Sequence, residues 1–372
     1  GEELKVAADD GGTPAHLAAR WGRISVLAFL HEHGKDLNVL AKDGSTPAHL
    51  AVAQKQYGVL CKFKVWGVDL NKSMSNGDTP AFIAVQNHDT RMLRLLSELG
   101  ADLNKDNGKG ISLAYVAAQE GDCDMLSQLD ACGVNMKQVT NEGATLAYLA
   151  AQAGHTKVIK LLHGKGVKLN QAKKDGSHAA IIAARQGCND VLRELKRLDT
   201  EYDLNQSSNE GMTPAIIAAS HGNTETLLVL KELGVNLSKP TYDGATPIFV
   251  AAESGRLPAL KALSHFGMDV HLKTYVSRKY LMQTAEQHPS VRFNLMAYFK
   301  LNDIAKDQEE VLISPFDIAN IVGYKDIVDF CSSLHSSVGE TVYNPLFFNK
   351  SQGPTSDDAN RSKSVMERAH PR

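Results

Sequence analysis

Apolar residues recur along the chain in pairs of short blocks, and each pair predicts two helices. The first block is rich in alanine and follows a glycine and a polar residue, as in GSTPAHLAV from Gly44. The second block has apolar residues at helical spacing, as in RMLRLLSEL over residues 91–99. A glycine and a short polar segment ending in Leu-Asn then close the unit, as in DLN over residues 102–104. Each unit therefore predicts a helix, a turn, a second helix and a polar hairpin.

The turn glycine that opens each unit recurs eight times. Successive glycines lie 33 residues apart, except for one interval of 35 between the sixth and the seventh. One such unit cannot bury its own apolar face, so neighbouring units must stack. The period predicts an all-α repeat solenoid, in which repeats one to eight begin at Gly11, Gly44, Gly77, Gly110, Gly143, Gly176, Gly211 and Gly244.

The start of the first helix is marked by a Thr-Pro pair in five of the eight repeats, as at Thr46-Pro47. Threonine supplies a cap for free backbone N–H groups, and proline suits the first helical position. Repeats four to six lack the pair, and repeat six also has two extra residues near residues 199–202. A lost cap costs about 0.5–2 kcal/mol. We therefore expect the middle of the array to be its softest part or to bend there; the alternative is drift that packing compensates.

This 33-residue unit resembles the ankyrin repeat, whose consensus block is G-x-T-P-L-H-x-A. His16 and His49 stand at the histidine position of that block, and we interpret both as structural residues that tie the turn to the helix. Alanine replaces the leucine after proline in seven of the eight repeats, which indicates a consistently repacked first helix. The resemblance covers residues 8 to about 270 closely and continues weakly to about residue 336.

The chain divides by pattern into three regions. Residues 1–270 hold the eight regular repeats, and residues 271–336 hold two degenerate repeats that act as a C-terminal cap, which makes about ten repeats in all. The helix pairs of this cap are expected within residues 284–299 and 314–334. Residues 337–372 are polar and are expected to be disordered; their apolar segment 343–348 either packs on the last helices or serves as a short linear motif. Because the chain opens almost directly in a hairpin, we expect that a preceding repeat or domain has been cut away.

Composition narrows the function. The 40 Lys and Arg residues balance 42 Asp and Glu residues, which argues against nucleic-acid binding. No run of about 18 apolar residues occurs, which argues against membrane insertion. Five cysteines without a CxxC motif are typical of a reducing compartment, so we expect a cytoplasmic location. No P-loop, GxGxxG, GxSxG or HExxH motif occurs, and we predict no enzyme activity, no cofactor and no metal site.

The resemblance implies that a partner protein binds the concave side of the stack, which the hairpin tips and the outer face of the first helices form. Among the residues at these positions Trp21 stands out, because exposed tryptophan is enriched in binding hot spots. Trp66 ends a second helix, where packing between repeats is the favoured interpretation. The candidate contacts are Arg20, Trp21, Lys42, Asp43, Gln54, Asn76, Gln86, Asn87, Gln119, Glu120, Gln152, Arg185, Gln186, His221, Tyr242 and Glu253.

Two function hypotheses follow. The favoured one is a non-enzymatic scaffold for protein–protein interaction, with the sub-case of a bacterial effector secreted into the host cytoplasm. The alternative is the substrate-recruiting arm of an enzyme whose catalytic domain is missing from this chain.

The resemblance also implies asparagine hydroxylation at hairpin positions that lie eight residues after a leucine, although such an asparagine can instead merely bond its own turn. The sites with this spacing are Asn38, Asn104, Asn170 and Asn236.

Overall fold

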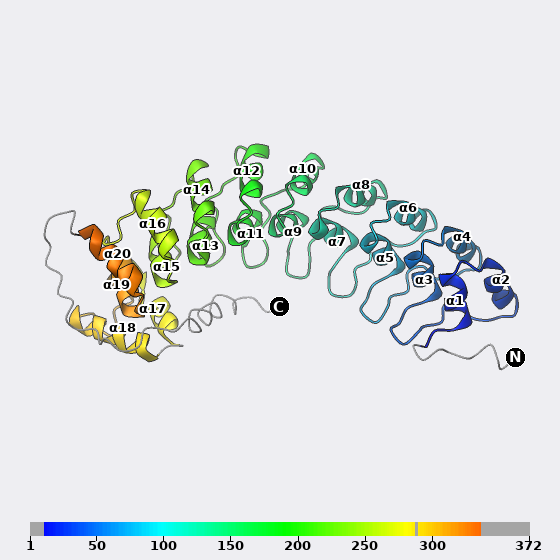
Figure 1. Ribbon diagram of the computed structural model, residues 1–372, viewed down its shortest axis with the longest axis horizontal. Coiled ribbons are helices and arrows are strands. Elements are labelled where there is room, and N and C mark those ends of the chain that lie inside the picture. The colour runs from blue at the N-terminus through cyan, green and yellow to red at the C-terminus, as the bar shows by residue number, and fades with distance from the viewer. Residues whose placement is uncertain (1–10, 287–288, 336–372) are drawn as a thin grey trace. The chain divides into compact units, whose positions relative to one another are not determined.

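The computed structural model describes residues 11–286 and 289–335, which form paired helices and one short two-stranded sheet (Figure 1). The contacts group the chain into two units, residues 1–174 and residues 175–372. The first unit contains repeats one to five, and in it each first helix packs against the first helix of the next repeat. Its helices are α1 (Pro14–Arg20), α2 (Ile24–Glu32), α3 (Pro47–Ala53), α4 (Tyr57–Val65), α5 (Pro80–Gln86), α6 (Thr90–Glu98), α7 (Leu113–Glu120), α8 (Cys123–Ala131), α9 (Leu146–Gln152) and α10 (Thr156–Gly164).

The second unit contains repeats six to eight and the C-terminal elements. Its first helices pack in the same manner, and its second helices α12, α14 and α16 form a separate row, which lies above the first helices in Figure 1. Its elements are α11 (Ala179–Gln186), α12 (Asn189–Leu198), α13 (Pro214–His221), α14 (Thr224–Glu232), α15 (Pro247–Glu253), α16 (Leu257–His265), β1 (Thr274–Ser277), α17 (Arg278–Ala285), α18 (Pro289–Leu301), β2 (Glu310–Ile313), α19 (Pro315–Val322) and α20 (Lys325–His335).

Alanine lines the contacts between first helices. Ala19, Ala84 and Ala150 are fully buried, and so is the alanine that replaces leucine after proline, for example Ala48. Small side chains let neighbouring helices approach closely, while larger residues of the second helices such as Leu93 fill the rest of the core. The buried alanines thus agree with the repacked first helix that the sequence indicated.

The first helices of repeats four and five do have N-terminal caps, although both lack the Thr-Pro pair. Ser112 Oγ accepts the backbone N–H of Tyr115 at 3.2 Å, and Thr145 Oγ1 accepts that of Tyr148 at 3.1 Å. A hydroxyl thus caps both helices without the proline. In repeat six His178 caps nothing with its side chain, and its Nε2 donates instead to the carbonyl of Gln206 at 3.1 Å. A soft or bent middle of the array stays a prediction.

The two histidines of the consensus block bridge neighbouring repeats. His49 Nδ1 accepts the backbone N–H of Thr46 at 3.1 Å, and its Nε2 donates to the carbonyl of Asp78 in the next repeat at 3.2 Å. His16 joins Thr13 to Ser45 in the same way. These partners assign the neutral Nε2–H tautomer. The structural interpretation of both histidines is confirmed, and their bonds reach one repeat further than expected.

The last repeats contain an insertion that the sequence pattern does not reveal. Strands β1 and β2 pair antiparallel, with Thr274 opposite Ile313. These residues correspond to Thr241 and Ala245, whose backbones close the preceding hairpin. Helices α17 and α18 are therefore inserted in the tip of one hairpin, and α19 packs directly on α15. Both expected helix pairs of the cap are present, but the second one continues the stack, and the first one begins at residue 278 instead of 284.

Candidate partner-binding surface

The structure places most of the predicted contact residues on the surface. Their side chains lie at the hairpin tips or at the C-terminal ends of first helices. The two exceptions are Arg185, which is half-buried, and Glu253, which is buried. The exposed ones are Arg20, Trp21, Lys42, Asp43, Gln54, Asn76, Gln86, Asn87, Gln119, Glu120, Gln152, Gln186, His221 and Tyr242.

Three glutamines form a row in the first unit. Gln86, Gln119 and Gln152 lie at equivalent positions near the ends of α5, α7 and α9, and all three are exposed. Because α7 packs against both α5 and α9, the spacing between neighbouring glutamines is that of packed helices, about 8–10 Å. An amide offers both a donor and an acceptor, so the row can bind a polar backbone or polar side chains.

The ends of the first helices are held by polar side chains from the next repeat. Gln56 Nε2 donates to the carbonyl of Arg20 at 3.2 Å, and His155 Nε2 donates to that of Gln119 at 2.9 Å. In the second unit Asn223 Nδ2 donates to the carbonyl of Arg185 at 2.9 Å. These bonds satisfy carbonyls that a helix end leaves free. They fix the backbone beneath the candidate contact residues and leave the exposed side chains to bind.

The two tryptophans have different surroundings. Trp21 is 63% exposed at the end of α1, and the guanidinium of Arg20 lies 5.7 Å from its ring centroid. Trp66 is half-buried and stacks on His31 of the preceding repeat, with ring centroids 5.4 Å apart. Packing between repeats is thereby confirmed for Trp66. Trp21 offers its ring to the solvent and remains the stronger candidate contact.

The hairpin tips carry turn chemistry as well as exposed side chains. Asp43 Oδ1 accepts the backbone N–H of Ser45 at 2.8 Å, and Asn76 Oδ1 accepts that of Asp78 at 3.0 Å. The hydrogen bonds from Ser45 lower the pKa of Asp43 below its ordinary value. Both residues therefore shape the turn, in addition to any contact that they make with a partner.

Comparison with family profiles decides the family. A profile described as ankyrin repeats in three copies matches residues 113–206 and 180–274, and one described as ankyrin repeats in many copies matches residues 15–63. These ranges together cover more than half of the chain. The chain belongs to the ankyrin repeat family. A search among curated proteins found no match to this sequence.

Glu253 is a correction to the predicted surface. It occupies the ankyrin-repeat position of Gln86 and Gln119, but it is only 8% exposed. The inserted helix α17 covers it: Thr284 Oγ1 donates to Oε1 at 2.7 Å, and the hydroxyl of Tyr280 donates to Oε2. Burial raises the pKa of Glu253 above its ordinary value. The equivalence of positions failed here because the covering helix comes from an insertion.

A cluster of titratable side chains beside the glutamine row was not predicted from the sequence. His88 Nδ1 lies 2.7 Å from Asp122 Oδ2, and its Nε2 lies 3.8 Å from Glu120 Oε2. The hydrogen bond with Asp122 raises the pKa of His88. The cluster joins ankyrin repeats three and four and lies next to Asn87, so it belongs to the same exposed surface.

A second exposed tyrosine stands one period after Tyr242. Tyr242 is 75% exposed at one hairpin tip, and Tyr275 in β1 is 61% exposed at the equivalent position of the next hairpin. Leu312, opposite Tyr275 in β2, is exposed as well. Sequence reasoning missed Tyr275 because repeat nine had no recognisable turn glycine. The 33-residue spacing from Tyr242 was the signal that could have found it.

Two of the four candidate hydroxylation sites connect neighbouring hairpins. Asn38 Oδ1 accepts the backbone N–H of Asp69 at 2.8 Å, and Asn104 Oδ1 accepts the side-chain amide of Gln138 at 2.9 Å. Both partners lie in the following ankyrin repeat. Asn236 Oδ1 instead accepts a bond within its own turn, and Asn170 is exposed. Hydroxylation of these residues stays a prediction.

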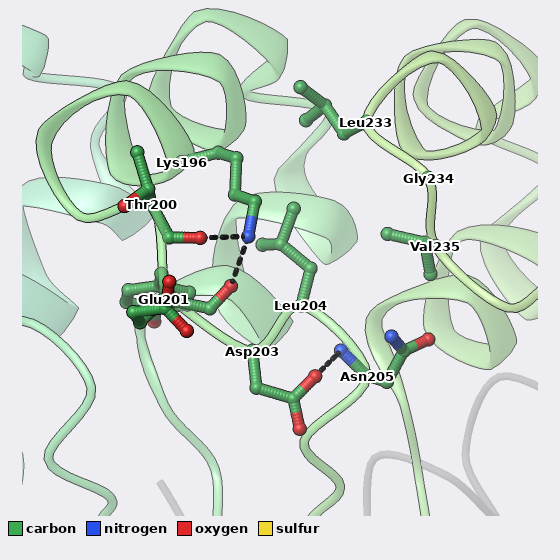
Figure 2. Close-up of a pocket in the computed structure, with 10 residues that line it drawn as sticks. Lys196, Thr200, Glu201, Asp203, Leu204, Asn205, Leu233, Gly234 and Val235 are labelled. Carbon is green, nitrogen blue, oxygen red and sulfur yellow. Dashed lines mark hydrogen bonds between the residues drawn. The ribbon is translucent and has the colours of Figure 1, made fainter.

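The two extra residues of repeat six line a small cavity of about 200 Å³ in the second unit (Figure 2). Lys196 Nζ donates to the carbonyls of Thr200 and Tyr202, at 2.5 and 3.1 Å. These hydrogen bonds stabilise the backbone of this segment. The cavity contains none of the candidate contact residues. We interpret the segment as a structural adaptation around the buried Tyr202.

Metal sites and membrane-spanning helices are two further features that residues 11–286 and 289–335 could contain. In that part of the chain, no three His, Cys, Asp or Glu side chains come together as metal ligands. None of the helices described there is long and apolar enough to cross a membrane. The five cysteines, Cys61, Cys123, Cys132, Cys188 and Cys331, are free thiols.

Proposed function

We propose that the chain is a non-enzymatic scaffold that binds a partner protein through the hairpin tips and the first-helix ends of its ankyrin repeats. Ankyrin repeats are typically protein–protein interaction modules, and the family is usually non-catalytic. Fold alone does not identify a partner. The proposal therefore depends on the side chains that this array presents.

The observation that carries the proposal is the separation between stacking residues and exposed residues. The glutamine row, Gln86, Gln119 and Gln152, is exposed, while alanines on the same helices are fully buried. The end of α7 is held through the backbone carbonyl of Gln119, so this side chain is not needed for that contact, and the side-chain amide of Gln86 donates to Asp78 of its own repeat at 3.4 Å. Trp21 adds a large exposed ring of the type found in binding hot spots.

Affinity capture from eukaryotic cell lysate with the intact chain tests the proposal. The test variant carries Trp21→Ala, Arg20→Ala, Gln86→Ala and Gln119→Ala. A partner identified with the intact chain is then purified, and its Kd is measured for both proteins. We expect a loss of about 2 kcal/mol or more, or roughly 30-fold in Kd, because Trp21 has the properties of a hot-spot residue.

A control variant carries Lys62→Ala, Lys64→Ala and Val65→Ala in α4. These side chains are also exposed, but they lie on a second helix. We expect this variant to bind as the intact chain does. Equal binding by all three proteins would move the site away from the proposed surface of the first unit, and loss in both variants would indicate damage to the fold.

The finer hypotheses are tested separately. A catalytic domain in the full-length coding sequence would favour the alternative, in which the array recruits substrates for an enzyme. A cytoplasmic location and secretion as a bacterial effector stay predictions that fractionation of the source cell and its host would test. Mass spectrometry that finds one added oxygen on a hairpin asparagine would support hydroxylation.

A further inference from the structure

Helix α18 exposes a stripe of large apolar side chains. Phe293 is 75% exposed and Met296 is 45% exposed. They lie three residues apart and therefore on one face of the helix, and the exposed Leu301 lies at its C-terminal end. Single exposed apolar residues are ordinary on protein surfaces, whereas adjoining ones often mark an interface. We call Phe293, Met296 and Leu301 the α18 stripe.

The α18 stripe lies close to the end of the described chain. Asn294 Nδ2 donates to the carbonyl of Ile321 near the end of α19, and the hydroxyl of Tyr298 donates to Asp317 near its start. Helix α20 follows α19 after a two-residue connection and packs against it as an antiparallel neighbour. The end of α20 is therefore level with the start of α19, which contacts the C-terminal half of α18.

The sequence after α20 contains one apolar cluster. All the aromatic residues of 336–372 are Tyr343, Phe347 and Phe348, and Leu346 stands between them. Elsewhere in that stretch apolar residues are sparse and surrounded by polar ones. Exposed aromatic rings are costly in water, so segment 343–348 needs an apolar surface to cover it.

Distance and charge permit the α18 stripe to be that surface. Tyr343 lies eight positions after His335, and eight extended steps of the chain span about 26–29 Å. Two successive helix packings, α20 on α19 and α19 on α18, span about 16–20 Å. The exposed Arg292 and Lys300 flank the stripe, and Glu340 precedes the segment. The segment can therefore reach the stripe with its acid beside a basic side chain.

We propose that residues 343–348 bind the α18 stripe within the same molecule, with the phenylalanines of the segment against Phe293 and Met296. The segment then covers the outer face of the inserted helix pair. This intramolecular contact does not depend on the proposed partner-binding function.

Side-chain accessibility in the full chain tests the contact. The tail variant carries Leu346→Ser, Phe347→Ser and Phe348→Ser, and its control carries Val365→Ser and Met366→Ser. Oxidation of Met296 by dilute peroxide, followed by mass spectrometry, reports exposure of the stripe. Hydroxyl-radical labelling of Phe293 reports the same face. We expect both rates to rise several-fold in the tail variant and to stay unchanged in the control.

The reciprocal experiment changes the stripe. Phe293→Ser with Met296→Ser in the full chain should speed chymotrypsin cleavage after Phe347 and Phe348 several-fold, whereas Val65→Ser on the exposed face of α4 should not. Unchanged melting and far-ultraviolet circular dichroism show that the variant folds; if it does not fold, the tail variant still decides. Unchanged labelling in the tail variant overturns the proposal. Protection that disappears on dilution together with a dimer in sedimentation also overturns it, because a second copy is then the occupant.

Discussion

His49 should be one of the costliest side chains to remove from the first unit. It is buried, and it satisfies the backbone N–H of Thr46 and the carbonyl of Asp78, which belongs to the next repeat. His49→Ala removes both hydrogen bonds, so the backbone N–H of Thr46 and the carbonyl of Asp78 each lose their bond to the imidazole. Because the two groups lie in different repeats, the substitution weakens the fold of one hairpin and the stacking on its neighbour together.

The magnitude follows from the two bonds. Each buried polar group that loses its partner costs about 1–3 kcal/mol. The volume of the missing imidazole adds a cavity term. The expected loss in the free energy of unfolding is therefore about 3–5 kcal/mol. Gln54→Ala, an exposed change at the end of the same helix, should stay within about 0.5 kcal/mol of the unchanged protein.

The pH dependence has a definite sign. Burial lowers the pKa of His49 in the folded chain below its ordinary value of 6.5. As the pH falls below that value, the unfolded chain binds a proton that the folded chain refuses, so stability falls. His49→Ala lacks this contribution. Its deficit relative to the unchanged protein should therefore be largest near neutral pH and shrink towards acid. Burial also lowers the pKa of His178, so the stability of the variant still falls to some extent towards acid pH.

Urea unfolding of the full chain, followed by circular dichroism at about pH 7.5 and about pH 5.5, measures both effects. A loss below about 0.5 kcal/mol at neutral pH would refute the bridging role, because an exposed substitution costs as much. A deficit that grows towards acid would contradict the assigned neutral histidine.

Three further substitutions probe the other contacts. Asn71→Ala removes the oxygen that accepts the backbone N–H of Asp102 at 2.7 Å, and in urea unfolding it should cost about 0.5–1.5 kcal/mol. Gly77→Ala should cost about 2 kcal/mol or more in the same assay, because φ is +92° and the new Cβ would lie 1.8 Å from the Asn107 carbonyl oxygen. Glu253→Gln should gain in melting temperature over the unchanged protein as the pH rises above about 4.5, because burial raises the pKa of Glu253 and the folded chain then holds a proton that the unfolded chain releases; a constant difference would count against this.

The period of the turn glycines was enough to predict the helix pairs, because each unit repeats the same local chemistry. The partners of the bridging residues were not predictable in the same way. Asn38 and Asn104 recur at hairpin positions, and their local alternative was a bond to their own turn. In the structure they bond residues of the next hairpin. A repeat pattern shows which residue recurs, but it does not show whether that residue bonds inside its unit or across to its neighbour.

The insertion of α17 and α18 set the limit of the surface prediction. Residue equivalence placed Glu253 with Gln86 and Gln119. That equivalence held for the three glutamines of the first unit, whereas in the second unit Arg185 is half-buried and Glu253 is buried. The next start that resembles Thr-Pro is Ser314-Pro315, which lies 68 residues after Thr246-Pro247. That interval is two periods and two residues, so it looked like one degenerate repeat followed by another. The pairing of β1 with β2 and the packing of α19 on α15 distinguish an insertion from an extra repeat.

Buried residues hold the repeats together, and exposed residues at the helix ends form the candidate surface. This separation explains how the array can vary its surface without losing its fold. Substitutions at buried alanines, at His49 or at Asn71 change contacts between repeats, so each of them reduces stability. Substitutions at exposed helix ends such as Gln119 leave the carbonyl bond from His155 in place, because that bond uses the backbone. If the chain binds a partner as proposed, its specificity can therefore change at these exposed positions at little cost in stability. At Glu253, the helix end of repeat eight, the same position is covered by α17, so the exposed helix ends of the second unit stop at repeat seven.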